Sequence, residues 1–215
     1  MSRLKQIFNL DRWLSFVFRR ISSQIYEDWC LHWRDWTLPG FRAVVVYRFG
    51  ARLLKNQTRS IKQRVLLMLY RMMYRYIRNH YGIELPATAI VGRRLTIGHQ
   101  GGIVIHPRAV IGDDCVILQN VTIGAATPLR HWEAPKLGNR VHVGVGAVVV
   151  GKVVIGDDVN IGPNVTVLTN IPSGTIVSPQ PPRLIYLQSK TTLRTWDIVT
   201  SATKAPEREP LTRKE

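Results

Sequence analysis

Acidic residues and cysteines are both scarce in this sequence of 215 residues. The 14 Asp and Glu are outnumbered by 30 Lys and Arg, so the formal net charge is +16. Cys30 and Cys115 lie far apart in the chain and have neither the spacing of a metal site nor the number of a disulfide framework. We therefore expect no bound metal, no disulfide and a reducing compartment.

Long hydrophobic runs are missing as well. The longest uninterrupted apolar run, from Val65 to Tyr70, is far too short to span a bilayer. The first residues of the chain interrupt their apolar positions with charges, which is not typical of a secretory signal. Glycine loops of the Walker or Rossmann type are also absent. These absences predict a cytoplasmic protein.

The excess of positive charge is concentrated in residues 1–82. No DNA- or RNA-binding motif accompanies it, so we expect no nucleic-acid partner. Aromatic residues and arginines alternate over residues 13–36, which leaves peripheral contact with the inner membrane open.

What the sequence has instead is a repeat of six residues. Aliphatic residues recur with this period from Val91 to Val167, slip by two residues between Ile103 and Ile105, and break at TPLRHWEAPK (127–136). A period of six fits neither an amphipathic helix nor an alternating strand. It predicts a left-handed parallel β-helix, in which three hexads close one triangular coil around stacked aliphatic residues. Gly, Asp and Asn at the corners accept the turn geometry.

A helical rhythm precedes the repeat. It covers residues 3–27, 40–55 and 61–80, and Pro39-Gly40 separates the first two segments. The expected fold class is therefore α+β. Its parts are a helical region at 1–82, the left-handed parallel β-helix at 83–178 and a partly disordered C-terminal extension at 179–215.

Glycine and aliphatic residues cannot move protons, so a catalytic base has to depart from the repeat. His99 is the clearest departure, because the pattern needs only a small spacer there. A neutral imidazole can take a proton from an attacking alcohol. His131, in the segment that interrupts the repeat, is a second candidate because such loops often carry function. His106 is interpreted as structural, and His142 as a residue that could face a cofactor groove.

Three segments resemble the serine acetyltransferase branch of the hexapeptide-repeat acyltransferases. They are PGFRAVVVYRFGARL (39–53), GHQGGIVIHPRAVIGDDCVILQNVTIG (98–124) and HWEAPKLGNRVHVGVGAVVVG (131–151). The resemblance covers roughly residues 35–185. It implies O-acetyl transfer from acetyl-CoA without a metal, in a homotrimer or a dimer of trimers whose sites lie between subunits.

The resemblance also implies roles for single residues. An acidic residue fifteen positions before the catalytic His orients it in the family, and Glu84 stands there. The family has a second His directly before a Pro-Lys pair, where this chain has Ala134, and His131 lies three residues earlier.

Coenzyme A would need a groove with a small-residue floor between adjacent β-helices. Open backbone N–H groups there would bind its amides and the oxyanion, and a basic residue would meet a phosphate. The expected cofactor-binding residues are Gly124, Ala125, Gly144, Ala147, Gly162 and Arg183.

The acceptor is where the sequence departs from the serine enzymes, which have Asp before the catalytic His. This chain has Gly98, and Asp28 and Asp35 are the acids that could bind an acceptor instead. The first interpretation is therefore a sugar or polysaccharide O-acetyltransferase with a glycan or small-molecule acceptor, as in exopolysaccharide and colanic-acid pathways. The alternatives are serine O-acetylation, as in cysteine biosynthesis, and a non-catalytic β-helical scaffold.

Overall fold

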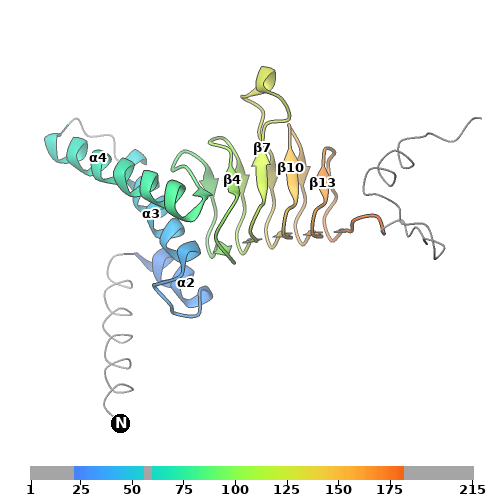
Figure 1. Cartoon of the computed structure of the whole chain (residues 1–215), viewed down its shortest axis with the longest axis horizontal. Coiled ribbons are helices and arrows are strands. Elements are labelled where there is room, and N and C mark those ends of the chain that lie inside the picture. The colour runs from blue at the N-terminus through green and yellow to red at the C-terminus, as the bar shows by residue number, and fades with distance from the viewer. Residues whose placement is uncertain (1–21, 56–59, 182–215) are drawn as a thin grey trace, which may run out of the picture. The chain divides into compact units, whose positions relative to one another are not determined.

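The computed structural model describes residues 22–55 and 60–181, and residues up to Pro179 belong to one unit. Helices precede a stack of short parallel strands (Figure 1). The helical elements are α2 (Ser23–Leu31), α3 (Pro39–Lys55), α4 (Ile61–Tyr76) and the single π-helical turn η1 (Ile77–Tyr81). The helices expected at 40–55 and 61–80 are confirmed, whereas most of the segment expected at 3–27 lies outside the described residues.

Local chemistry explains where two of these helices begin. Pro39 opens α3, because its ring presets φ and its missing N–H costs nothing in a first helical turn. Ser60 caps α4 by accepting a hydrogen bond from the backbone N–H of Lys62 at 3.3 Å. The two helices then differ in burial. One face of α3 is buried, but α4 has no buried residue and exposes apolar side chains such as Met68.

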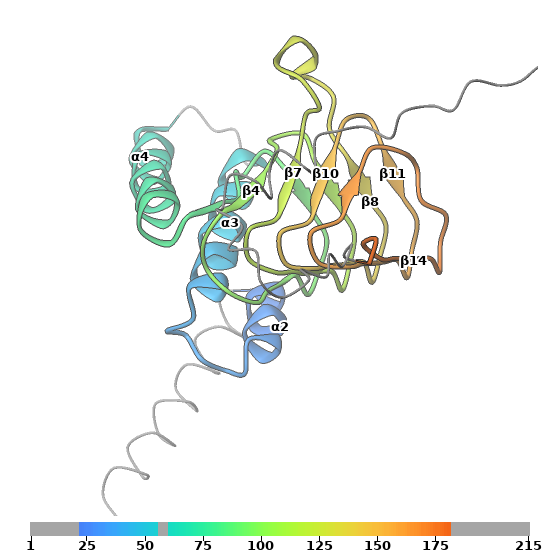
Figure 2. The same cartoon turned by 45° about the vertical axis from the view of Figure 1, so that its right-hand side comes forward.

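The parallel strands form three sheets, and each sheet supplies one side of every coil (Figures 1 and 2). Sheet A contains β1 (Ile83–Glu84), β4 (Ile103–Ile105), β7 (Thr122–Gly124), β10 (Val148–Val150) and β13 (Thr166–Val167). Sheet B contains β2 (Ile90–Val91), β5 (Val110–Ile111), β8 (Lys136–Leu137) and β11 (Val154–Ile155). Sheet C contains β3 (Thr96–Ile97), β6 (Val116–Ile117), β9 (His142–Val143), β12 (Asn160–Ile161) and β14 (Ile176–Val177). This is the left-handed parallel β-helix that the hexad repeat predicted.

The register of the strands explains the first slip in the repeat. Regular coils pair residues 18 positions apart, as when Asn160 lies opposite His142. In the first coil the spacing is 20, because Thr96 lies opposite Val116. The two extra residues fall in the corner at 98–102, between β3 and β4. The slip therefore marks a corner that is wider than the others.

The second slip marks a loop at 125–135, between β7 and β8. It contains the short 3-10 helix η2 (Pro128–Arg130) and stands out from the coils above β7 in Figure 1. The strands on either side keep their pairing, since Val116 of β6 lies opposite His142 of β9 across a spacing of 26 residues. The insertion is thus absorbed at one corner without disturbing the stack.

Two ion pairs reinforce another corner. Arg94 and Asp114 lie in consecutive coils, with Nε and Oδ1 2.5 Å apart, and Arg140 and Asp158 repeat the arrangement at 2.6 Å. All four residues have φ between 55° and 58°, a left-handed conformation that the tight corner requires. The pairs are partly exposed, so we attribute corner alignment to them rather than a large share of the stability.

The first coil presents backbone groups that no further coil can pair, and tyrosines from the helices satisfy several of them. The hydroxyl of Tyr47 donates to the carbonyl of Ala89 at 2.9 Å and accepts from the N–H of Val91 at 3.0 Å. The hydroxyl of Tyr70 accepts from the N–H of Ala87 at 3.0 Å. The helices therefore act as a cap on the open end of the β-helix.

The core of the coils generates a stability prediction. Ile117 is fully buried among the stacked aliphatic residues. Ile117→Ala should lower the free energy of unfolding by about 2–5 kcal/mol, because it removes apolar contacts and leaves a cavity. Val154→Ala, at a position that is 50% exposed, is the control and should change it by about 0.5 kcal/mol or less. Urea denaturation followed by circular dichroism measures both, and equal losses would contradict the inward orientation of Ile117.

Candidate active site

His99 lies in the widened corner between β3 and β4, and its side chain is exposed. The corner itself is fixed, because the N–H of Gly101 donates to the carbonyl of Tyr81 at 2.9 Å. Gly101 and Gly102 have φ of 100° and 64°, a conformation in which glycine avoids strain. The structure therefore presents the imidazole of His99 at the surface of the first coil, on a corner whose backbone is hydrogen-bonded to the preceding residues.

Glu84 lies in sheet A, in the strand next to the one that follows the His99 corner. It belongs to β1, one rung below β4, where it is opposite Val104. The hydroxyl of Tyr74 donates to its Oε1 at 3.4 Å. Burial, together with the charge of Glu84, raises the pKa of Tyr74 to about 12. Within residues 22–55 and 60–181 no hydrogen bond or ion pair joins Glu84 to His99, so the orienting role of Glu84 stays a prediction.

His131 is not brought to His99 within one chain. Its loop leaves sheet A after β7, at the edge shared with sheet B, whereas the His99 corner joins sheet C to sheet A. The backbone of the loop is anchored by His106, whose Nε2 donates to the carbonyl of His131 at 2.8 Å. Nδ1 of His106 accepts from the N–H of Arg108 at 3.1 Å. His106 thus anchors the loop at the end of η2, while the ring of His131 stays exposed.

The expected floor of the coenzyme A groove needs correction at three positions. The N–H of Gly144 donates to Ile161 at 2.8 Å and that of Gly162 donates to Val177 at 2.7 Å, so neither is open. Ala147 is fully buried, because its side chain lies among the stacked core residues and cannot line a groove.

The other expected groove residues differ from these three. A Cβ placed on Gly124 would meet only Cγ2 of Thr122, at 3.6 Å, so space remains there. Ala125 is half-buried at the start of the loop. His142 is half-buried in β9, and its Nδ1 has no hydrogen-bond partner among the described residues. Arg183 lies outside the described residues.

Asp28 is not available to an acceptor, and this expectation was wrong. It is fully buried in α2, where its carboxylate accepts hydrogen bonds from Nε of Arg48 at 2.9 Å and from Nη2 of Arg48 at 3.3 Å. Burial raises the pKa of Asp28, and the guanidinium of Arg48 opposes that change. Arg48 also donates to the carbonyls of Val91 at 3.1 Å and Gly92 at 2.6 Å. Asp28 therefore holds an arginine that joins the cap to the first coil.

Asp35 remains a candidate for binding the acceptor. It is half-buried in the connection between α2 and α3. Its Oδ1 accepts hydrogen bonds from the N–H of Thr37 at 2.7 Å and from the hydroxyl of Thr37 at 2.6 Å. These bonds fix the turn.

No repeat or motif singles out His32, which the structure places in the same buried network. Nδ1 of His32 donates to the carbonyl of Asp28 at 2.6 Å, and Nε2 accepts from the N–H of Ile97 at 3.2 Å. Burial lowers the pKa of His32. His32 is the C-cap of α2 and follows Asp28 by four residues, and this position at a helix end is the one sequence signal that could have linked them.

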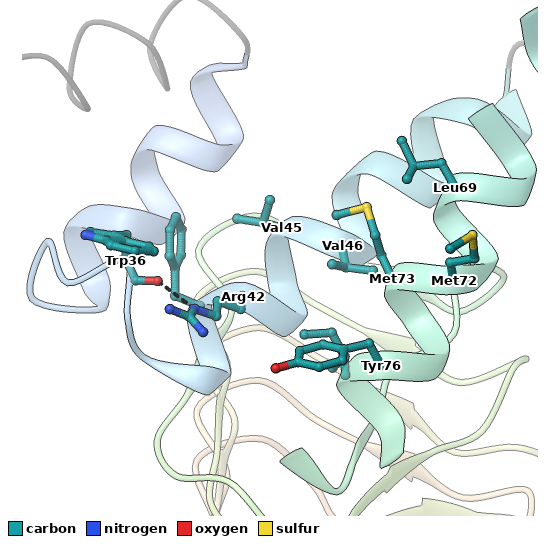
Figure 3. A pocket seen from close by; sticks show the side chains of 10 residues that line it. Trp36, Arg42, Val45, Val46, Leu69, Met72, Met73 and Tyr76 are labelled. Atoms are coloured by element: carbon teal, nitrogen blue, oxygen red, sulfur yellow. Dashed lines mark hydrogen bonds between the residues drawn. The ribbon is translucent and has the colours of Figure 1, made fainter. Parts of the chain in front are cut away.

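An apolar cavity of about 510 Å³ lies between α3 and α4 (Figure 3). Met72, Met73 and Tyr76 of α4 line it together with Arg42 of α3, whose guanidinium lies 5.1 Å from the centre of the ring of Trp36. No His, Asp or Glu lines the cavity, so it cannot supply a general base. In the described part of the chain there is no cluster of three metal-ligating side chains, and none of its helices is long and apolar enough to cross a bilayer.

Comparison with known sequences points to one family. A family model described as bacterial transferase hexapeptide (six repeats) matches residues 134–169. A serine acetyltransferase of Helicobacter pylori is 40% identical over 136 residues, which cover 63% of this chain and 75% of that protein. A serine acetyltransferase of Synechococcus elongatus is 37% identical over 148 residues, or 69% of this chain and 57% of that protein.

Solved structures agree with these relatives. The crystal structure of serine acetyltransferase isoform 3 from Entamoeba histolytica in complex with cysteine gives a TM-score of 0.60 at 26% identity, covering 82% of this chain and 63% of that one. The soybean serine acetyltransferase apoenzyme gives a TM-score of 0.59 at 27% identity, covering 69% of this chain and 58% of that one. This chain therefore spans less than two thirds of both solved chains. None of these four relatives is named as a sugar or polysaccharide enzyme, so the narrower resemblance to exopolysaccharide and colanic-acid relatives is not supported.

A stability measurement distinguishes the structural role of Asp28 from the candidate acceptor-binding role of Asp35. Asp28→Asn should lower the free energy of unfolding by about 3–5 kcal/mol, because it leaves the buried charge of Arg48 without its partner. Asp35→Asn, the matched control, should cost about 1 kcal/mol or less. Chemical denaturation measures both. Wild-type stability in Asp28→Asn, with weaker acceptor binding, would return Asp28 to the acceptor site.

Proposed function

This chain belongs to the hexapeptide-repeat acyltransferase family, and we propose that it transfers the acetyl group of acetyl-CoA to the hydroxyl of L-serine. The main support is the 40% identity to the Helicobacter pylori serine acetyltransferase over three quarters of that protein. The exposed His99, on a fixed corner of the matched fold, supplies the chemistry. This proposal reverses the order suggested by the sequence, in which a sugar acceptor came first.

In the proposed reaction, the neutral imidazole of His99 takes the proton of the serine hydroxyl as its oxygen attacks the thioester carbonyl. The tetrahedral intermediate then collapses, the carbon–sulfur bond breaks, and the coenzyme A thiolate takes the proton back from the imidazolium. General-base catalysis of this kind contributes about 10²–10⁴-fold in rate. Glu84 would hold the second imidazole nitrogen and so fix its tautomer.

We further propose that two copies of the chain complete one site. Within one chain, His99 precedes the strands of sheet A and the loop of His131 follows them, so in this proposal a neighbouring chain would bring its own loop to the His99 corner. A homotrimer would repeat this arrangement three times. Acetyl-CoA would then lie between adjacent β-helices, with Gly124 and Ala125 at the base of the loop as part of its floor.

One observation favours a second candidate, sugar O-acetylation. The serine enzymes that this chain resembles have an acid directly before the catalytic His, where Gly98 stands here. A Cβ at Gly98 would lie 2.6 Å from Cδ2 of Leu118, so the side chain of Leu118 fills the space beside the corner. An ammonium group would have no carboxylate there, whereas a sugar hydroxyl needs none.

An acceptor assay separates the candidates. Purified protein is incubated with acetyl-CoA and either L-serine or a panel of sugars and nucleotide sugars, and the free thiol is followed with a colorimetric reagent. We expect serine to raise thiol release at least tenfold above background hydrolysis. Release that depends on a sugar and not on serine would establish the second candidate. A protein that neither binds coenzyme A nor turns over would be a scaffold.

His99→Ala tests the base. Because the variant lacks the proton acceptor, kcat should fall by about 10²-fold or more, while coenzyme A binding measured by calorimetry stays unchanged. Gln100→Ala, at the exposed neighbouring position, is the control and should keep kcat within about threefold. Full turnover in His99→Ala would remove His99 from the mechanism.

A further inference from the structure

We propose that His32 positions His99 by holding the backbone of the first coil at Ile97. The kinetic part of this inference rests on the proposed function, whereas its structural part can be measured without any turnover. His32 is fully buried and bonds to backbone groups of Asp28 and Ile97, so it is a positioning residue and not a catalytic one.

One edge of β3 has no neighbouring strand in the part of the chain that the structure describes. The N–H groups of Thr96 and Gly98 point to the next coil, where they donate to Cys115 at 2.9 Å and Ile117 at 3.0 Å. The intervening N–H of Ile97 points the other way, where no strand follows. An unpaired N–H in this buried position would cost the fold a hydrogen bond. Nε2 of His32 accepts that bond at 3.2 Å.

Other residues of the helical region hold the backbone around Ile97 as well. Gly40 of α3 lies against the carbonyl of Ile97 so closely that a Cβ would collide with it. The backbone N–H of Leu95 also reaches the carboxylate of Asp28. The helical region thus contacts the backbone at Ile97 of β3 and at Leu95, directly before this strand. His99 follows Ile97 by two positions, so a shift of Ile97 is transmitted directly to the corner.

The imidazole of His32 has to be neutral to accept the hydrogen bond from Ile97. With its proton on Nδ1, His32 donates to the carbonyl of Asp28 and leaves Nε2 free to accept from Ile97. A protonated ring would set an N–H of Nε2 against the N–H of Ile97. The groups around the ring are the Asp28 carboxylate of α2, Arg48 and Phe41 of α3, and the backbone of β3.

The direction of the pH effect follows from burial. Because burial lowers the pKa of His32 below its ordinary value of 6.5, the folded protein favours the neutral ring. The contribution of His32 to stability is therefore complete above pH 6.5 and is lost as the pH falls below that value through the lowered pKa of the folded state. Release of Ile97 at acidic pH would disorder the corner.

Two substitutions separate positioning from mere packing. In His32→Gln the side-chain oxygen can reach the position of Nε2 and accept from Ile97. In His32→Asn the amide can still donate to the carbonyl of Asp28 but is too short to reach Ile97. We expect His32→Asn to lower kcat by about 10–100-fold, because a small displacement of a catalytic group has effects of this size. The KM for acetyl-CoA should stay within about twofold, and His32→Gln should restore most of kcat.

Hydrogen exchange measured by mass spectrometry provides the readout that needs no turnover. The peptide 95–102 contains the N–H of Ile97, and 159–165, in a later coil, is the internal reference. His32→Asn should exchange about fivefold faster in 95–102 alone, the factor for one lost hydrogen bond of ordinary strength. His32→Gln should retain most of the protection. A folded His32→Asn protein with wild-type protection would overturn the proposal, whatever its activity.

The wild-type protein gives a second test if His32→Asn does not fold. On acidification below pH 6.5, 95–102 should lose protection relative to 159–165 after correction for intrinsic exchange rates. At acidic pH, kcat of the wild-type protein should also fall more steeply than kcat of His32→Gln, because protonation of His32 adds to the loss. If the protection of 95–102 relative to 159–165 did not change with pH, the proposal would be overturned. If serine is not turned over at all, the proposed function fails while the exchange result still decides the role of His32.

Discussion

The structure depends on how the open edge of its first coil is satisfied. A parallel β-helix pairs each coil with the next, so the first coil faces away from the stack with N–H and carbonyl groups that have no strand partner. Here the partners are polar side chains on helices. Tyr47, Tyr70, Arg48 and His32 each bond to the backbone of that coil. Buried polar groups that would be a liability in an ordinary helix bundle therefore help to dock the helices, beside the apolar packing of residues such as Val44 and Val46 against the coils.

This arrangement links the cap to the candidate active site. The coil that the helices cover is also the one that is widened at 98–102, and the widening exposes His99. A residue on a free loop would be mobile, whereas His99 follows a strand that is bonded on one side by β6 and on the other by His32, the C-cap of α2. A buried aspartate that could be mistaken for a substrate ligand, Asp28, instead keeps Arg48 in place.

The hexad pattern was enough to predict the β-helix, because only inward stacking of coils explains a period of six. Its two slips also located the corner of His99 and the loop of His131. The inward position of Ala147 could have been read from the same pattern, since it lies two residues before the core residue Val149. The partners of Asp28, and the pairing of the Gly144 N–H with Ile161, could not, because both depend on segments that meet only in the folded chain.

Beyond the loop the rungs repeat with a spacing of 18 residues, which shortens to 16 at β14, and this near-regular spacing has a consequence for how such chains change length. The helices fit one particular coil, with its own side-chain partners, so nothing can be inserted at that end without losing them. The later coils are nearly interchangeable. Duplication or deletion of one 18-residue segment there would shift the following rungs as a block and leave the widened corner untouched. A change in the number of coils should therefore disturb the fold less at the far end of the stack than beside the helices.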